Sequence, residues 1–215
     1  MKVFATPTIG ILFLTTIVVL ILAASVDAYA QDRMPPIPAD KMTNDQKKAL
    51  EEFVAARGTP TGPWVALLRS PDVMTRARAL SDYLRFKSVL PPRLSEFVIL
   101  MTARQWTQQY EWNAHYQLAM NGGLKPDIAK AIAEGRRPEH MAEDEEILYN
   151  FCMELHRNQS VSDVTYARAV SKFGEQGVID TVSLTGYYTL ISMILNTVRT
   201  PLPAGVTPGL GPFPR

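Results

Sequence analysis

The residues best suited to chemistry lie in one segment of the chain: Glu96, Glu111 and His115. Glu111 and His115 are four positions apart, and on a helix this spacing places both on one face, where they can act on the same small ligand. Glu96 lies among apolar residues, and burial makes a carboxyl group hold its proton more tightly unless a cation neutralises it. A carboxyl group in that state can serve as a general acid near neutral pH. We therefore predict Glu96, Glu111 and His115 to be catalytic.

Aromatic side chains accompany these residues. Trp106 and Tyr110 lie between the two acids in the sequence, and aromatics that meet titratable groups inside a helical bundle typically hold small organic ligands. We predict that both bind substrate. Two acids and one histidine can in principle bind a divalent metal ion, but their spacing matches no established metal motif, so no metal is expected. The other histidines, His140 and His156, are expected on the surface.

Each of these residues also has a purely structural interpretation. A histidine on an amphipathic helix is more often a core or surface residue than a catalyst. Glu111 can be a solvated residue paired with His115, and a buried base such as Arg93 or Arg104 can neutralise Glu96. The aromatic residues, taken singly, can belong to the core.

Composition excludes several classes of protein. The chain of 215 residues carries 22 Lys and Arg against 21 Asp and Glu, a net charge of +1, so it has no basic excess for a nucleic acid backbone. With 47% hydrophobic and 20% charged residues it is globular rather than disordered. Its one cysteine, Cys152, cannot form an intrachain disulfide, a cysteine-rich zinc site or a paired redox dithiol.

The first thirty residues are typical of an export signal. Lys2 gives a positive start, residues 9–24 (IGILFLTTIVVLILAA) are apolar, and Ala28-Tyr29-Ala30 supplies small residues at the positions that a signal peptidase reads. We predict cleavage after Ala30 and a periplasmic or secreted protein without a membrane segment. The alternative is an uncleaved anchor, for which the apolar run is only marginally long enough.

The remaining elements are predicted to be helical. Residues 31–42 and 200–215 are rich in Pro and are expected to be extended arms. Between them, residues 43–199 show helical apolar spacing, with Thr43 and Gln46 as a capping box and Gly58 and Gly174 as helix ends. Residues 94–106 (LSEFVILMTARQW) are apolar almost all round, which is typical of a central helix. The sequence predicts one all-α domain of about seven helices with two arms.

The segment 96–119 (EFVILMTARQWTQQYEWNAHYQLA) resembles the carboxymuconolactone decarboxylase family, which includes the AhpD branch of alkylhydroperoxidases. The similarity extends through Gly123-Leu124, the GRRP at 135–138, the helix that begins EDEE and the closing FGEQGVIDTVSLTGYYTLISMILNTV, and it covers most of residues 43–203. The resemblance implies an AhpD-like helical bundle.

The peroxidase branch carries a Glu, eleven residues, a Cys, two residues, a second Cys, three residues and a His. On this chain the Glu falls on Glu96 and the His on His115, while Gln108 and Glu111 occupy the two cysteine positions. Peroxide reduction by that branch proceeds through a thiolate and its disulfide. Cys152 matches neither position, so the resemblance does not carry peroxidase activity over to this chain.

The decarboxylase branch resembles the chain better. It implies loss of carbon dioxide from a carboxylated unsaturated lactone, leaving a delocalised carbanion that must be stabilised and protonated. By analogy, His115 is the proton donor or the electrostatic partner of the departing carboxylate, Glu96 sets its protonation, and Glu111 is a second acid or an orienting group. The reaction that gives the family its name is cytoplasmic, whereas this chain carries an export signal, so a different substrate is expected.

We therefore predict an exported, cofactor-free lyase of this all-α family that acts on a small carboxylated lactone or cyclic acid. The alternatives are a non-catalytic member that binds a small ligand in the same pocket and a thiol peroxidase, which the cysteine count disfavours. A trimer or hexamer is expected from the resemblance, since the closing helix over residues 178–195 is more apolar than a small monomer readily covers.

Overall fold

The computed structural model describes residues 32–212. The predicted signal peptide, its cut after Ala30 and the last three residues lie outside the described residues. Within them the chain is helical and contains no strand, so the predicted all-α class is confirmed. The elements are η1, a 3-10 helix (Ala39–Lys41), and the α-helices α2 (Asn44–Arg57), α3 (Pro63–Leu67), α4 (Pro71–Phe86), α5 (Pro92–Gln105), α6 (Gln109–Asn121), α7 (Pro126–Ala133), α8 (Glu143–Asn158) and α9 (Asp163–Val198).

Local sequence signals set several helix ends. At the start of α2, the Gln46 amide donates to the Thr43 hydroxyl over 3.2 Å and the Thr43 amide donates to the Gln46 side chain over 3.0 Å, which completes the predicted capping box. Gly58 ends this helix with φ of 77°, a left-handed conformation that glycine adopts without strain. The loop that follows contains the short helix α3, which the Pro and Gly content of the segment did not predict.

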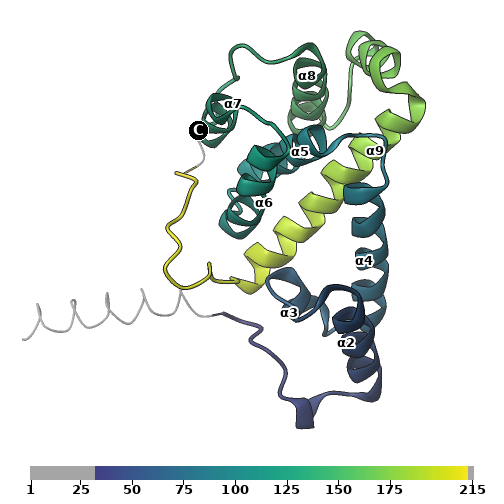
Figure 1. Ribbon diagram of the computed structural model, residues 1–215, viewed down its shortest axis with the longest axis vertical. Coiled ribbons are helices and arrows are strands. Elements are labelled where there is room, and N and C mark those ends of the chain that lie inside the picture. The colour runs from purple at the N-terminus through teal and green to yellow at the C-terminus, as the bar shows by residue number, and fades with distance from the viewer. Residues whose placement is uncertain (1–31, 213–215) are drawn as a thin grey trace, which may run out of the picture.

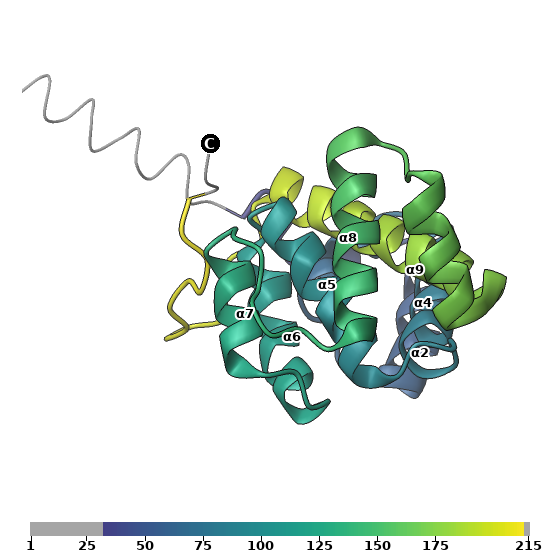
Figure 2. The same ribbon diagram turned by 90° about the horizontal axis from the view of Figure 1, so that it is seen from above.

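Helix α5 is the centre of the bundle. Eleven consecutive residues, 94–104, are buried, and α5 packs against α4, α6, α7, α8 and α9 (Figure 1). Viewed from above, α6 and α7 lie on one side of it and α8 and α9 on the other (Figure 2). A residue on α5 is therefore surrounded on all sides, and a charged residue there needs a partner.

Helix α9 crosses the whole molecule (Figure 1). Gly174, with φ of 69° and ψ of 173°, interrupts it, as the sequence predicted for a helix end at this residue. Asp180 is the single charged residue in the stretch 179–198, and it is buried, accepting hydrogen bonds from the Tyr83 hydroxyl and the Val89 amide, each at 3.1 Å. By length and composition α9 could cross a membrane, but 56% of its most apolar window is buried inside the protein, as in the core helix of a globular protein.

The C-terminal segment after α9 packs against α5 and α6. Over residues 200–212 it has no helix or strand, yet Leu210 is buried. The Gln109 side chain donates to the Leu210 carbonyl over 2.6 Å and accepts from the Leu210 amide over 3.0 Å. The arm is therefore attached to the bundle beside α6.

Candidate active site

The site begins with a contact between α5 and α6. Oε2 of Glu96 lies 2.5 Å from Nδ1 of His115, and both side chains are more than nine-tenths buried. The continuous apolar pattern of α5 places Glu96 inside the bundle, and the neighbouring α6 supplies the histidine. The structure therefore brings together two residues from different helices that the sequence predicted to act together.

Glu111 completes the acidic environment of the histidine. It lies one helical turn before His115 on α6, with its Oε2 3.4 Å from Nε2 of His115, and it is also buried. The ring of Tyr188 from α9 meets the imidazole edge-on, with the ring centroids 5.0 Å apart. Each nitrogen of His115 thus has a carboxylate partner, and an aromatic ring fixes the plane of the imidazole.

Two carboxylates favour the charged form of His115. Burial by itself lowers the pKa of the imidazole, but the hydrogen bonds to Glu111 and Glu96 and the negative charges of both acids outweigh it, so the pKa of His115 is raised above its ordinary value of 6.5. The two carboxylates therefore stabilise the protonated form of His115, the imidazolium. A cation that carries a dissociable proton at each nitrogen is a suitable proton donor.

Arg85 is the cation that neutralises Glu96. Its Nη2 lies 3.6 Å from Oε1 of Glu96, the oxygen that does not contact the histidine. The arginines suggested by the sequence have other roles. Arg93 pairs with Asp144 and Glu145, and Arg104 donates to the carbonyls of residues 133 and 211. The sequence suggested other arginines because they are closer to Glu96 along the chain, whereas Arg85 contacts Glu96 from a different helix, α4.

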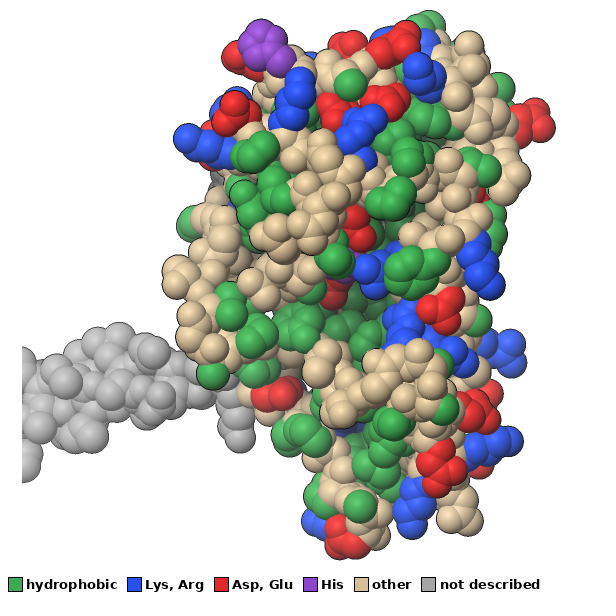
Figure 3. Space-filling model, in the orientation of Figure 1, with side chains coloured by type: hydrophobic (Ala, Val, Ile, Leu, Met, Phe, Trp, Pro, Cys, Tyr) green, Lys and Arg blue, Asp and Glu red, His purple; other side chains and the backbone are tan. Residues whose placement is uncertain are grey.

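His115 and Glu111 open onto a cavity of about 220 Å³ between α2, α3, α4, α6 and α9. In the orientation of Figure 1, this face of the molecule is hollowed near its middle, with hydrophobic side chains on the floor and Lys or Arg side chains along one edge (Figure 3). Glu96 does not line the cavity but lies behind His115. The lining residues are Arg57, Thr61, Pro63, Trp64, Ser81, Arg85, Tyr110, Glu111, Ala114, His115, Leu118, Tyr187, Tyr188 and Ile191.

Two arginines give the cavity its positive side. Arg57 is fixed by an ion pair with Asp82 and a 3.2 Å hydrogen bond to Ser81, and its guanidinium lies 5.1 Å from the centre of the Trp64 ring. Arg85 lines the cavity as well, and its buried Nε has no hydrogen-bond partner among the described residues. Both guanidinium groups therefore place positive charge on the cavity wall.

Of the two aromatic residues predicted to bind substrate, the structure places one at the cavity and the other away from it. Tyr110 lines the cavity, and its ring packs so closely on Gly62 that a Cβ added there would overlap it. Gly62 is thus required both for this contact and for its positive φ of 56°. Trp106 is not brought to the cavity. It lies at the end of α5 beside a separate shallow hollow, with His156 and residues of α9.

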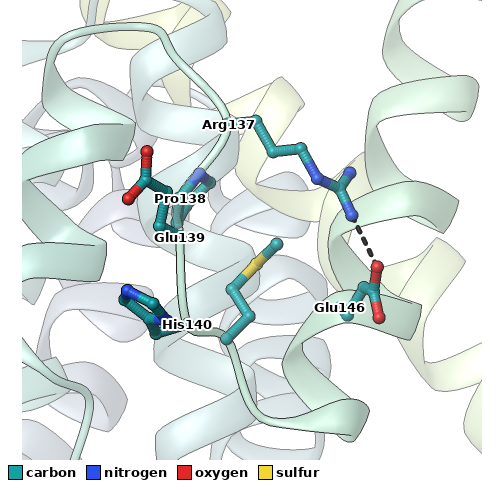
Figure 4. Close-up of a pocket in the computed structure, with 6 residues that line it drawn as sticks. Arg137, Pro138, Glu139, His140 and Glu146 are labelled. Carbon is teal, nitrogen blue, oxygen red and sulfur yellow. Dashed lines mark hydrogen bonds and ion pairs between the residues drawn. The ribbon is translucent and has the colours of Figure 1, made fainter.

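Three other residues whose side chains could take part in a reaction lie away from the cavity. Cys152 is fully buried on α8, and burial raises the pKa of its thiol to about 12. His156, expected on the surface, is half-buried, and desolvation lowers its pKa to about 4. His140 is exposed, as expected, on the rim of an open depression with Arg137, Glu139 and Glu146 (Figure 4). In the part of the chain that the structure describes, no cluster of three or more His, Cys, Asp or Glu side chains could hold a metal ion.

Comparison with known proteins identifies the fold. An uncharacterised peroxidase-related protein from Ralstonia eutropha with an AhpD core superposes with a TM-score of 0.66, at 17% identity, covering 80% of this chain and 92% of that chain. The chain therefore has the AhpD-like fold. The debrominase Bmp8 superposes with a TM-score of 0.63, at 10% identity, covering 81% and 94%, and a variant of Bmp8 in complex with 2,3,4-tribromopyrrole superposes with a TM-score of 0.62, at 10% identity, covering 80% and 91%. No protein-family model and no curated protein sequence matches the chain.

The sequence predicted only three of the residues that line the cavity, Tyr110, Glu111 and His115. Arg57 and Arg85 belong to amphipathic helices rich in charged residues, and nothing in their spacing distinguishes them from the surface arginines of those helices. Tyr187 and Tyr188 lie in the apolar closing helix, and nothing in their sequence context marks them as part of a site. Their hydroxyls remain protonated at neutral pH, because desolvation raises the pKa of Tyr187 to about 12 and that of Tyr188 well above its ordinary value.

Proposed function

We propose that this AhpD-like protein is an exported, cofactor-free lyase that decarboxylates, or otherwise moves a proton on, a small carboxylated lactone or cyclic acid. The observation that carries the proposal is the placement of His115 between Glu96 and Glu111 on the wall of a cavity with two arginines. The cavity lies below the roughly 300–1,000 Å³ typical of drug-sized sites, which fits a substrate of about one ring.

The arginines favour an anionic substrate. Arg57 and Arg85 both line the cavity, where guanidinium groups can bind a carboxylate with paired hydrogen bonds, and partial burial strengthens such bonds. Glu111 lies beside Nε2 of His115 and disfavours a second anion there. A substrate carboxylate is therefore directed to the arginines, and its ring to Tyr110 and Trp64.

His115 then supplies the proton. In decarboxylation, the bond between the ring carbon and the carboxylate breaks, carbon dioxide leaves, and the electron pair remains delocalised over the unsaturated lactone. Nε2 of His115 donates its proton to the carbanion, which forms the new C–H bond and leaves the imidazole neutral. The imidazole regains a proton from water, and Glu96 at Nδ1 again stabilises the cation. Glu96 is a positioning residue, because it does not line the cavity.

Thiol peroxidase chemistry fits the residues poorly. The one cysteine of the chain is buried on α8 with its pKa raised to about 12, so it carries almost no thiolate at neutral pH. Gln108 and Glu111 stand where the peroxidase branch has its two cysteines. The similarity in fold to a peroxidase-related protein therefore does not carry that activity here.

The test pairs turnover with binding. Purified protein is incubated with carboxymuconolactone and related lactone acids, and both product formation and the ligand dissociation constant are measured. His115→Gln should abolish turnover and leave affinity within about tenfold, since the shape of the cavity and most contacts remain. His140→Gln, on the exposed rim of another depression, is the matched control and should change neither. Binding without turnover in the unsubstituted protein would support the ligand-binding alternative and contradict the proposal that the protein is an enzyme.

Export is tested separately. Expression with the complete N-terminal segment, followed by cell fractionation and intact-mass measurement, should give a periplasmic or secreted protein that begins at Gln31. A full-length chain retained in the membrane would support the anchor instead.

A further inference from the structure

A chain of hydrogen bonds runs along one wall of the cavity, from α2 through α4 to α9. It begins at Arg57, the last residue of α2, whose guanidinium group is paired with Asp82. Nη2 of Arg57 donates to Oγ of Ser81 over 3.2 Å, and Ser81 is hydrogen-bonded in turn to the hydroxyl of Tyr187. Helix α4, which carries Ser81, packs against both α2 and α9 (Figure 1). The chain of bonds therefore joins three segments that are far apart in the sequence.

The hydrogen bonds of this chain run in one direction, toward Tyr187. A guanidinium group can only donate, so Ser81 accepts from Arg57 and its own hydroxyl proton is left for Tyr187. Tyr187 accepts from Ser81 and keeps its phenolic proton for another acceptor. Among the described residues, Ser81 is the only hydrogen-bond partner of Tyr187. The phenolic proton is therefore available to a ligand.

The hydroxyl of Tyr187 lies among the charged groups of the cavity. Tyr187 and Ser81 line the cavity together with Arg57 and Arg85. Burial raises the pKa of Tyr187 to about 12, against the lowering effect of the hydrogen bond from Ser81. Glu111 also raises this pKa, and the two arginines lower it. The phenol therefore stays protonated at neutral pH, and the nearby arginines favour negative charge on an atom that it contacts.

A donor in this position suits an oxygen atom that becomes negatively charged. When a carboxylate leaves an unsaturated lactone as carbon dioxide, the electron pair moves through the ring double bond to the carbonyl oxygen, which becomes an enolate oxygen. A donor that is already aimed at this oxygen stabilises the developing charge without reorganisation. In a buried chain each hydrogen bond polarises the next, so Tyr187 is a stronger donor than an isolated phenol.

We propose that Tyr187 is a further catalytic residue of the cavity, which donates a hydrogen bond to the carbonyl oxygen of a lactone and stabilises the enolate formed there. Ser81 and Arg57 are positioning residues that act through Tyr187. The inference rests on the proposed function, in which the ligand is an unsaturated lactone acid. The enolate oxygen is stabilised from α9 by Tyr187, and carbon is protonated from α6 by His115. The phenol keeps its proton throughout.

Arg57 can serve this chain and the substrate carboxylate together. Its Nε and Nη2 make the bonds to Asp82 and Ser81. These bonds leave Nη1 for the substrate, so the two assignments to Arg57 do not compete.

The binding of two related lactones tests Tyr187 without turnover. Tetronate is a lactone enolate with its negative charge on oxygen at neutral pH, and butenolide is the neutral unsaturated lactone with the same ring. The unsubstituted protein, expressed with its complete N-terminal segment, should bind tetronate more tightly than butenolide. Tyr187→Phe, which removes only the hydroxyl, should weaken tetronate binding about 10- to 100-fold, as expected for a lost hydrogen bond to a charged group. Butenolide binding should weaken by less than about fivefold.

Ser81→Ala tests the chain that leads to Tyr187. It should weaken tetronate binding about three- to tenfold and leave butenolide binding within about twofold, a selective effect that disturbed packing would not produce. Tyr166→Phe is the matched control, because Tyr166 is 46% exposed on α9 before Gly174 and does not line the cavity, and it should change neither affinity. Circular dichroism confirms that each variant is folded. Tetronate binding that Tyr187→Phe leaves unchanged, or equal losses for the two lactones, would overturn the inference.

Turnover separates this inference from the proposed function. With a lactone acid as substrate, Tyr187→Phe should lower kcat about 100-fold and leave KM within about threefold, because the enolate charge develops only toward the transition state. Tetronate binding that depends on Tyr187 without any product would support the donor assignment and contradict the proposed function. Product formation with the same kcat in Tyr187→Phe would overturn the inference and leave the proposed function standing.

Discussion

Glu96 and His115 are nineteen residues apart in the sequence, yet Oε2 of Glu96 and Nδ1 of His115 are separated by 2.5 Å. The contact joins two neighbouring helices, α5 and α6, and is enclosed by the core on the side away from the cavity. It gives the histidine one fixed orientation, with Nε2 directed toward Glu111. This arrangement is the basis for the predictions on catalysis.

Replacing Glu96 should shift the pH dependence of turnover. His115 donates a proton only while it is protonated, so turnover falls as the pH rises through its pKa. Glu96→Gln removes a negative charge that raises this pKa, while the burial that lowers it remains. The falling limb of the pH profile should therefore move to lower pH, and turnover at pH 7 should drop about tenfold or more. Glu51→Gln, on the exposed side of α2, is the control. An unshifted pH profile would mean that Glu96 does not influence the proton transfer by His115.

Arg85 should determine substrate affinity. Arg85→Met removes a cation that lines the cavity, and the Michaelis constant for an acidic substrate should rise about 10- to 100-fold, the range expected for a lost charge-assisted hydrogen bond. The amide or ester of the same substrate should lose much less. Arg76→Met, exposed on the same helix, should have no effect. Equal losses for the acid and the ester would mean that Arg85 does not bind the carboxylate.

Tyr110 and Trp106 should behave differently. Tyr110→Ala removes part of the cavity wall and should weaken ligand binding by about tenfold through lost contact area. Trp106→Ala should leave ligand affinity unchanged, because Trp106 lies beside a separate hollow and does not line the cavity. Calorimetric titration of both variants with the same ligand measures the difference.

His156 should destabilise the protein in mild acid. Desolvation lowers its pKa from 6.5 to about 4 in the folded state, so between these values the unfolded chain binds a proton that the folded chain does not. Stability is therefore lost as the pH falls below 6.5. At pH 5 the loss amounts to about 2 kcal/mol. Urea unfolding at pH 7 and pH 5 measures it, and His156→Gln should reduce the difference between the two pH values by that amount. A variant with the same pH dependence as the unsubstituted protein would contradict the assignment.

Cys152 should be chemically inert in the folded protein. It is fully buried with a raised pKa, and its Sγ lies 3.7 Å from the hydroxyl oxygen of Thr185. A thiol reagent should react with it only in denaturant, and Cys152→Ser should retain full turnover with lactone acids. Rapid modification of the native protein, accompanied by loss of turnover, would contradict this prediction.

The order of the helices along the chain and the burial of α5 could be predicted, because both depend on local sequence signals. The capping box at Thr43, the end of a helix at Gly58 and the break at Gly174 follow from side-chain and glycine geometry within a few residues. The apolar run of residues 94–106 predicted a central helix, and with it the burial of Glu96. The spacing of Glu111 and His115 likewise predicted a shared helix face, because four residues is close to one turn.

The partners of these residues depend on packing between distant segments, which no local pattern encodes. Arg85 on α4 neutralises Glu96, although Arg93 and Arg104 are nearer in the sequence. Tyr110 reaches the cavity and Trp106 does not, although both lie in the same aromatic segment, because Trp106 caps the end of α5 whereas Tyr110 lies in the first turn of α6. The sequence by itself determined that the helix carrying Glu96 is buried and that Glu111 and His115 share a helix face. Only the tertiary structure decided which charges meet, because ion pairs and cavities form between helices whose relative positions are set by the packing of the whole core.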